Sequence, residues 1–362
     1  MSYADPSLLR EEPPLEVLTE NIRKGKSITW YRSPLTTAQM KELHQKSDWK
    51  AAWQTLGHLG LLITLGALAY YASSHWPWPV TVLLIFALGV CSSFHINAVH
   101  ELGHMTVFKT RWLNTFFCHV FGFLGWINHQ TFQSSHTRHH RYTLHPPDDL
   151  EVELPVRLVL WHFVRDGIIN FNAIRYVLVY NWRLARGHFK GVWELTLYPD
   201  AAPEKRREAI RLSRFTLAGH GLVFLVSAIT GLWMLFVLIS LAPFLGNGLQ
   251  MLCNSTQHVG LQDNVNDFRL CSRTFLLHPF IRFLYWQMNY HIEHHMYAAV
   301  PCYNLKKLHE IIAQDLPPTP SGLIAVWKEI LAILRKQEKE PNYQHVVPLP
   351  PPKPRLAGVS RA

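Results

Sequence analysis

Two long stretches of the chain carry no formal charge. Residues 51–100 contain no Asp, Glu, Lys or Arg, and neither do residues 215–262. A helix crosses the roughly 30 Å hydrocarbon core of a bilayer in about 20 residues, so each stretch is long enough for two crossings. The pattern predicts an all-α integral membrane protein with two helical hairpins, whose four spans lie at about residues 53–72, 80–99, 215–231 and 232–252.

The turns of the hairpins and the basic residues around them predict an orientation. The first turn, SSHWPWP, carries Trp76 and Trp78, which suit the interface of a bilayer, and the second hairpin is expected to break near Thr230 and Gly231. Lys and Arg crowd the segments before, between and after the hairpins. The positive-inside rule then places both termini and the central segment in the cytoplasm, at the endoplasmic reticulum of a eukaryote or the inner membrane of a bacterium.

Composition narrows the class of protein further. Only 17% of the 362 residues are charged, yet the net charge is +10. We assign this excess to topology and anionic headgroups, or to docking of an acidic protein, and expect no nucleic-acid partner. The five cysteines form no CxxC pair, which argues against a disulfide framework and a zinc knuckle. A soluble protein is disfavoured because two stretches of about 50 residues would have to fold in water without a charge.

The chain divides into three parts. Residues 1–50 form a polar cytoplasmic segment without the apolar core of a signal peptide, residues 51–315 form the membrane domain, and residues 316–362 form a C-terminal helix and a Pro-rich tail. Between the hairpins, residues 154–187 mix aromatic and charged positions at helical spacing, as helices on a membrane interface do. Residues 198–215 predict a surface helix that leads back into the membrane.

Several of the 22 histidines follow a spacing that suits metal binding. HELGH places two histidines at i and i+4, and HTRHH and HIEHH each place three at i, i+3 and i+4, so that each set lies on one helix face. In NSTQH an asparagine and a histidine, Asn254 and His258, have the same i, i+4 spacing. The candidate ligands are His100, His104, His136, His139, His140, Asn254, His258, His291, His294 and His295.

Adjacent histidines indicate that the site holds two ions. Two neighbouring residues on a helix diverge by about 100°, so His139 and His140, or His294 and His295, cannot easily bind one ion from the same side. The predicted topology puts every motif on the cytoplasmic side, where they can converge. Imidazole suits Fe, Zn, Cu or Ni, so the ligands alone do not identify the metal.

These motifs resemble the three histidine boxes of the integral-membrane fatty acid desaturase and hydroxylase superfamily. HELGH matches the first box, HTRHH the second and HIEHH the third, and with the two hairpins the resemblance covers about residues 50–315. It implies nine histidine ligands on two iron ions, with Asn254 as a weak or water-mediated ligand, and oxidation of a lipid acyl chain by O2. The chain lacks an HPGG haem motif. The resemblance therefore implies a separate electron donor, cytochrome b5 or a ferredoxin.

Other residues near the boxes are candidates for supporting roles. Ligating histidines usually donate their second N–H to a carboxylate, and among the nearby acids Asp263 and Asp267 are favoured over Glu293. His95 and His145 are reserve ligands. The supporting acids are Asp263, Asp267, Asp148, Asp149 and Glu101, and the candidates for a substrate channel are Trp126, Trp161, Trp182 and Trp286.

Other functions remain open at this point. HELGH alone is the signature of a zinc protease with Glu101 as general base, but that class leaves HTRHH and HIEHH unexplained. A metal transporter would place its histidines near the bilayer midplane rather than beside the spans. Within the superfamily the resemblance favours desaturation over hydroxylation of a lipid, alkane, sterol or carotenoid.

Overall fold

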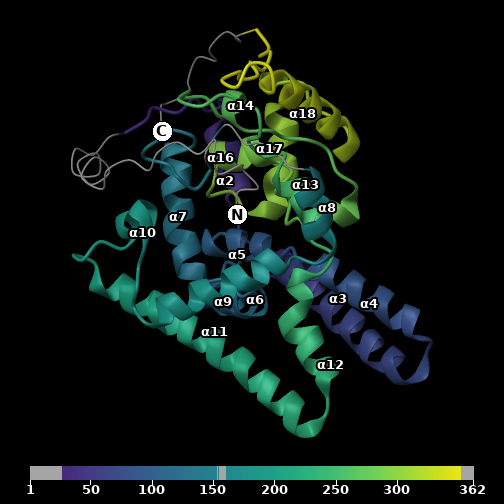
Figure 1. Ribbon diagram of the computed structural model, residues 1–362. Coiled ribbons are helices and arrows are strands. Elements are labelled where there is room, and N and C mark those ends of the chain that lie inside the picture. The colour runs from purple at the N-terminus through teal and green to yellow at the C-terminus, as the bar shows by residue number, and fades with distance from the viewer. Residues whose placement is uncertain (1–26, 153, 155–159, 352–362) are drawn as a thin grey trace.

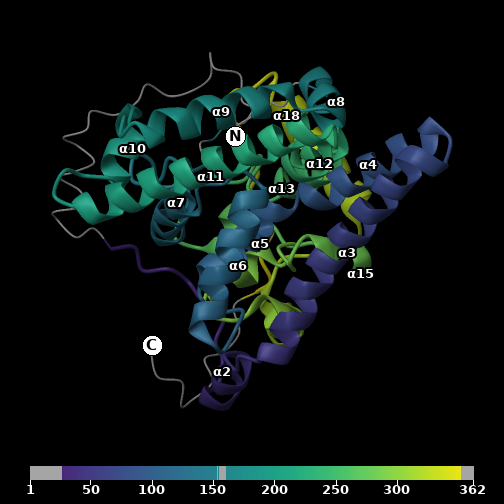
Figure 2. The same cartoon turned by 90° about the horizontal axis from the view of Figure 1, so that it is seen from below.

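The computed structural model describes residues 27–152, 154 and 160–351, and within these ranges it is helical, with isolated β-bridges but no strand. Figures 1 and 2 show two helical hairpins that project from a body of shorter helices. The predicted all-helical architecture is confirmed. The predicted segment 1–50 lies partly, and the tail beyond residue 351 wholly, outside the described residues.

The first hairpin consists of α3 (Asp48–His75) and α4 (Trp78–Ser92), and the latter continues into α5 (His95–Gly103). Ser47 caps α3 by accepting a hydrogen bond from the amide of Lys50, and Pro77 separates the two long helices. Their outer faces are apolar and open, with Trp53 at 73% and Trp78 at 76% exposure. Exposed aromatic and aliphatic side chains over such a length suit contact with lipid rather than water.

The second hairpin begins with α11 (Pro203–Thr230), which ends where Gly231 adopts a left-handed φ of 76°. The chain returns through α12 (Trp233–Phe236), a π-helical turn (Val237–Leu241) and a 3-10 turn (Ala242–Phe244). The predicted span 232–252 is therefore not one continuous helix. Pro243 lacks the amide that would continue it, and the indole of Trp126 donates to the carbonyl of Ser240 at 2.9 Å.

Three described helices are long and apolar enough to cross a membrane: α3, the joined helix Trp78–Gly103, and α11. Residues Trp233–Phe244 form a shorter apolar helix. The structure thus supports a membrane protein, and the count of four spans stays a prediction.

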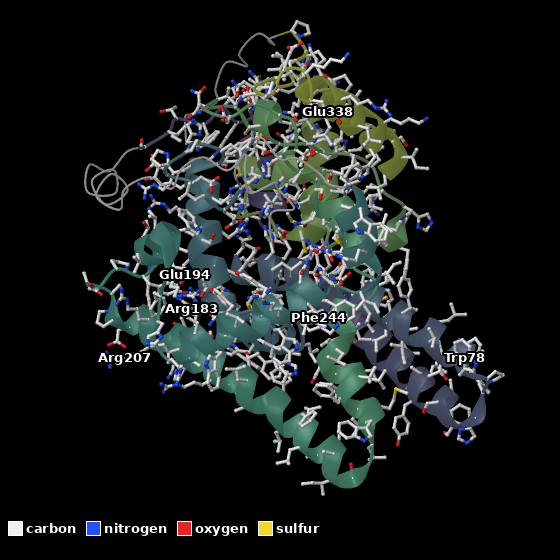
Figure 3. All side chains as sticks on the ribbon, viewed as in Figure 1. Trp78, Arg183, Glu194, Arg207, Phe244 and Glu338 are labelled. Atoms are coloured by element: carbon white, nitrogen blue, oxygen red, sulfur yellow. The ribbon has the colours of Figure 1, made fainter. Side chains whose placement is uncertain are left out.

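The remaining helices form the body. The helix α6 (Arg111–Leu124) was not predicted; it packs on α5 and leaves Trp112 65% exposed. Figure 3 shows Trp78 at the far tip of the first hairpin, whereas Arg183, Glu194 and Arg207 lie together near the start of α11. The other helices are α2 (Thr37–Leu43), α7 (His129–Tyr142), α8 (Leu160–Ile168), α9 (Phe171–Ala185), α10 (Gly191–Leu197), α13 (Gly248–Asn254), α14 (Phe268–Cys271), α15 (Pro279–Leu284), α16 (His291–Met296), α17 (Leu305–Ile312) and α18 (Leu323–Gln337).

A close contact joins the two hairpins near the body. A Cβ on Gly89 of α4 would lie 2.6 Å from the carbonyl oxygen of Leu245, so only glycine permits this approach. The contact holds the end of the broken helix against α4. It also positions the start of α13, which packs on α4 and α8 and ends at Asn254 of NSTQH.

Candidate metal centre

Each histidine motif lies on a short helix of the body or at its end. HELGH closes α5, HTRHH fills the second half of α7, HIEHH begins α16, and His258 follows α13. Their ring nitrogens gather in two groups, within each of which all the nitrogens lie within 4.8 Å of one another. We call these the five-histidine cluster (His100, His104, His136, His140 and His294) and the four-histidine cluster (His139, His258, His291 and His295).

The structure separates the adjacent histidines as their helical geometry requires. His139 belongs to the four-histidine cluster and His140 to the five-histidine cluster, and the same division holds for His295 and His294. Because α7 and α16 each contribute to both clusters, the two groups lie side by side between these helices. The arrangement is that of a di-metal site built from the nine histidines.

The ring nitrogens point at one another in a way that suits a shared cation. The Nε2 atoms of His140 and His294 lie 3.0 Å apart, and that of His291 lies 2.9 Å from His258 and 3.1 Å from His295. The Nε2 atoms of His100, His104 and His136 are buried and have no hydrogen-bond partner. Nitrogens about 2.1 Å from one ion lie roughly 3.0 to 4.2 Å from each other, so both clusters fit a metal.

Buried acceptors hold several of the rings from behind. The Nδ1 atom of His139 lies 2.8 Å from Asp149, and that of His100 lies 3.0 Å from Glu101. Asp149 and Glu101 therefore occupy the supporting positions expected of them. The Nδ1 atom of His258 lies 2.7 Å from the carbonyl oxygen of Cys271. Such contacts select the tautomer that leaves Nε2 free for a metal.

One supporting acid was missed. The carboxylate of Glu151 lies 2.8 Å from Nδ1 of His136. Glu151 follows the two candidates Asp148 and Asp149 in the sequence, fifteen residues after His136. Its presence after PPDD was the only available signal, because the chain reversal that brings it back to α7 has no local sequence pattern.

The other predicted acids, Asp148, Asp263 and Asp267, contact residues outside the two histidine clusters in the interactions that we see. Asp267 caps α14 and pairs with Arg269 at 2.7 Å, and Asp263 accepts a hydrogen bond from Gln344 at 2.8 Å. Asp148 pairs with Arg138 at 3.5 Å. The partners seen for Asp263 and Asp267 thus lie on other elements, because each follows NSTQH on a segment that turns away, and a supporting role for these two acids stays a prediction. Glu293 faces Thr274 and His309.

Burial and charge set the protonation of the ligands. Burial lowers the pKa of His104 to about 4 and that of His258 to about 3, so both rings are neutral near pH 7 and offer a lone pair. For His139 burial acts in the same direction, but the carboxylates of Asp149 and Glu151 outweigh it and raise the pKa. A metal ion bound at Nε2 of His139 would replace the proton that this nitrogen carries when the ring is protonated.

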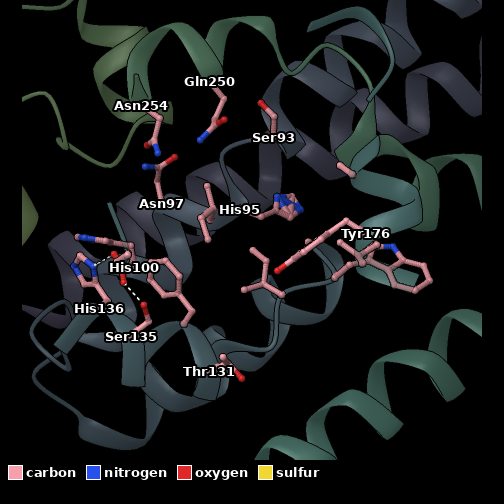
Figure 4. A pocket seen from close by; sticks show the side chains of 18 of the residues that line it. Ser93, His95, Asn97, His100, Thr131, Ser135, His136, Tyr176, Gln250 and Asn254 are labelled. Carbon is pink, nitrogen blue, oxygen red and sulfur yellow. Dashed lines mark hydrogen bonds and ion pairs between the residues drawn. The ribbon is translucent and has the colours of Figure 1, made fainter. Parts of the chain in front are cut away.

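A cavity of about 630 Å³ opens beside both clusters and is lined by ligand candidates from each, including His100, His136, His258 and Asn254 (Figure 4). Of the four channel candidates, only Trp126 lines this cavity. Trp286 is fully buried in the core and donates to Nδ1 of His58 at 3.1 Å, while Trp161 and Trp182 are 68% and 58% exposed.

The reserve ligands join neither cluster. His95 lines the cavity, one helical turn and a little before His100 on α5. The Nδ1 atom of His145 lies 2.9 Å from the carbonyl oxygen of Thr143, and the ring packs on Trp30. Both are accordingly removed from the ligand set.

The fatty acid desaturase family model matches residues 76–327, which is more than half of the chain and includes all nine cluster histidines. The chain belongs to the fatty acid desaturase family. This desaturase is 25% identical over 294 residues to the human sphingolipid delta(4)-desaturase/C4-monooxygenase DES2, covering 78% of this chain and 81% of the relative. It is 23% identical over 290 residues to the sn-1 oleoyl-lipid 12-desaturase of Anabaena variabilis, covering 76% and 79%.

Membership in this family makes the chain an oxidoreductase, a desaturase of lipids. The two clusters agree with this class. A zinc protease needs one ion and would leave the four-histidine cluster without a role, so the family and the geometry together exclude the protease interpretation of HELGH.

Proposed function

We propose that this desaturase holds one iron ion in each histidine cluster and uses them to introduce a double bond into a lipid acyl chain with O2. The observation that carries the proposal is the division of nine histidines into two adjacent groups of converging ring nitrogens, with three Nε2 atoms of the five-histidine cluster left without a hydrogen-bond partner. Asn254, which lines the same cavity, completes the ligand set weakly or through water. When bound, the irons supply the oxidising power to remove hydrogen from an unactivated methylene.

The chain's own residues position both the ligands and the substrate. Asp149, Glu101 and Glu151 fix the rings of three ligands, and the cavity places a lipid beside both clusters. Trp126 and Phe244 close part of its wall with apolar surface, which excludes water from the reacting carbon.

Electrons come from a separate protein, cytochrome b5 or a ferredoxin. Both donors are acidic, and the chain has a net charge of +10. On α17 the side chains of Lys306 and Lys307 are 56% and 48% exposed, and they pair with Glu310 and Glu42. Support for docking therefore comes from the net positive charge of the chain as a whole, which would speed the encounter with an acidic donor.

The topology belongs to the same proposal. Residues 51–315 form the membrane domain with four spans, the broken helix Trp233–Phe244 and the start of α13 making the last, and both termini face the cytoplasm. This arrangement places the clusters at the cytoplasmic surface of the membrane, where an electron donor can reach them.

Hydroxylation is a second candidate because one relative combines the two activities in its name, as a desaturase/C4-monooxygenase. Both reactions begin with removal of one hydrogen and then differ in whether a second hydrogen leaves or oxygen is inserted. The substrate is either a sphingolipid or an acyl lipid, the two classes that the relatives' names contain.

Expression in a host of known lipid composition tests the function. We expect a new unsaturated lipid, identified by mass spectrometry, in cells with the wild-type chain and none with His139→Ala. His145→Ala is the matched control, because this histidine lies outside both clusters, and it should retain the product. A lipid profile identical to that of the empty host, despite correctly inserted protein, would overturn the proposal; an added hydroxyl would favour the second candidate.

A further inference from the structure

Three polar side-chain atoms at the cavity have no hydrogen-bond partner. The Nδ1 atom of His95 and the Oδ1 atoms of Asn97 and Asn247 are buried and unpaired, and all three residues line the cavity. His95 and Asn97 are each only 3% exposed. A buried polar atom without a partner destabilises the fold, so this group is better explained as the binding site of another molecule.

These side chains come from two elements on either side of the cavity. His95 and Asn97 belong to α5, and Asn247 immediately precedes α13. Its amide nitrogen donates to the carbonyl oxygen of Pro243 at 3.0 Å, so its oxygen is left for a ligand. Figure 4 shows the side chain of Asn97 pointing toward that of Asn254, with Gln250, Ser93 and His95 on neighbouring parts of the cavity lining. We call His95, Asn97 and Asn247 the polar subsite.

The polar subsite is close to the reacting centre. Asn97 precedes His100 by three residues on one helix, so the two side chains share a face and their Cβ atoms are roughly 5 to 6 Å apart. A group held by Asn97 therefore lies near the five-histidine cluster. We infer that this group belongs to the part of the substrate next to the oxidised carbon and not to a headgroup at the far end of a long acyl chain.

The described side chains around the cavity offer no cationic partner to an anionic group at this position. Among the residues that the structure describes, none of those that line the cavity is a lysine or an arginine. Its acids are Glu151 and Glu194, and the latter is already paired with Arg183 on α9. Phosphate and carboxylate groups need cationic partners when they are buried, whereas a hydroxyl or an amide is satisfied by neutral donors and acceptors.

We propose that the polar subsite binds a neutral hydroxyl group of the substrate, a few bonds from the carbon that is oxidised. The inference rests on the proposed function and narrows its substrate to a lipid with a neutral, hydrogen-bonding backbone near the reacting methylene. An acyl chain whose nearest polar group is a phosphate or a coenzyme A thioester does not meet this requirement.

The test compares three probes on the purified full-length protein with its electron donor. The first is a saturated C18 aminodiol carrying an N-acyl group, the second is the same amide without its secondary hydroxyl, and the third is the coenzyme A thioester of a saturated C18 acid. We expect kcat/KM to fall at least about tenfold from the first probe to the second, as for loss of a buried hydrogen bond, and further for the third. Equal rates, or preference for the thioester, would overturn the inference without any variant.

Asn97→Leu tests the assignment to residues. The change keeps the volume and removes the hydrogen bond, so it should lower kcat/KM for the first probe about tenfold, mostly through KM, and leave the second probe nearly unchanged. Asn172→Leu is the control, since this exposed residue of α9 does not line the cavity, and it should discriminate like the wild type. An equal loss on both probes, with the iron content unchanged, would contradict the proposal.

The two levels of failure are distinguishable. Oxidation of the host's acyl lipids without activity on either amide probe would overturn the polar subsite and leave the desaturase function intact. Absence of oxidation of every lipid by protein that holds both irons would overturn the proposed function itself.

Discussion

Truncation of Glu151 tests whether residues that do not bind metal control its affinity. One carboxylate oxygen of Glu151 lies 2.8 Å from Nδ1 of His136, and the other accepts a hydrogen bond from Ser135 at 2.5 Å. The Nε2 atom of His136 faces the five-histidine cluster without a partner. Glu151→Ala would leave the ring free to rotate and would weaken its basicity as a ligand.

The expected size of the effect follows from this contact. Burial raises the pKa of Glu151 to about 7, so the measurement is made well above that pH, where the carboxylate is charged. A hydrogen bond to a charged group contributes about 1.5 to 3 kcal/mol. The Glu151 side chain is 20% exposed, so we take the lower part of that range, about 1.5 to 2 kcal/mol. Each 1.4 kcal/mol corresponds to a factor of ten in affinity, which gives a loss of roughly 10- to 30-fold for one iron.

Chelator titration measures this loss. Purified wild type, Glu151→Ala and the control Glu204→Ala are dialysed against increasing chelator, and the iron retained is determined by mass spectrometry. Glu204 is 81% exposed on the first turn of α11 and pairs only with Arg207 among the ion pairs seen, so its variant should match the wild type. We expect one of two irons in Glu151→Ala to leave at a 10- to 30-fold lower chelator concentration. Two irons held as firmly as in the wild type would refute the reasoning.

Three further predictions address the clusters, the cavity and the topology. His139→Ala and His140→Ala should each lower the iron content from two ions toward one, because these adjacent histidines belong to different clusters. If one of the two variants lost both irons and the other lost none, the division into two clusters would be contradicted. Trp182→Ala should leave KM for the lipid substrate within about twofold of the wild-type value, because this residue is exposed and does not line the cavity. A large rise in KM would show that Trp182 contacts the substrate after all. The five native cysteines are buried, so a membrane-impermeant thiol reagent should report introduced cysteines alone. In sealed vesicles, Ser74→Cys should be labelled only from the side opposite the cytoplasm and Glu310→Cys only from the cytoplasmic side. Labelling of both variants from the same side would contradict the orientation.

The histidine clusters were the most predictable part of the molecule because their geometry is local. The spacing of His136, His139 and His140 fixes their directions on α7 once that segment is helical, and the division of the adjacent pair follows from 100° per residue. The apolar stretches likewise predict α3 and α11 from length and absence of charge.

Features that depend on chain reversal were not predictable in this way. Glu151 reaches His136 only because the segment after α7 folds back, and Asp263 and Asp267 follow NSTQH in sequence yet turn to other partners. Trp286 shows the same limit, because a buried aromatic residue has no sequence mark that separates core from channel. The break of the predicted fourth span at Pro243 did have a signal in the sequence.

Anomalous diffraction at the iron absorption edge, from crystals of the purified full-length protein, tests the central claim most directly. The account predicts two iron peaks, one among the nitrogens of the five-histidine cluster and one among those of the four-histidine cluster. A single peak, or peaks that appear at the zinc edge and not at the iron edge, would contradict it.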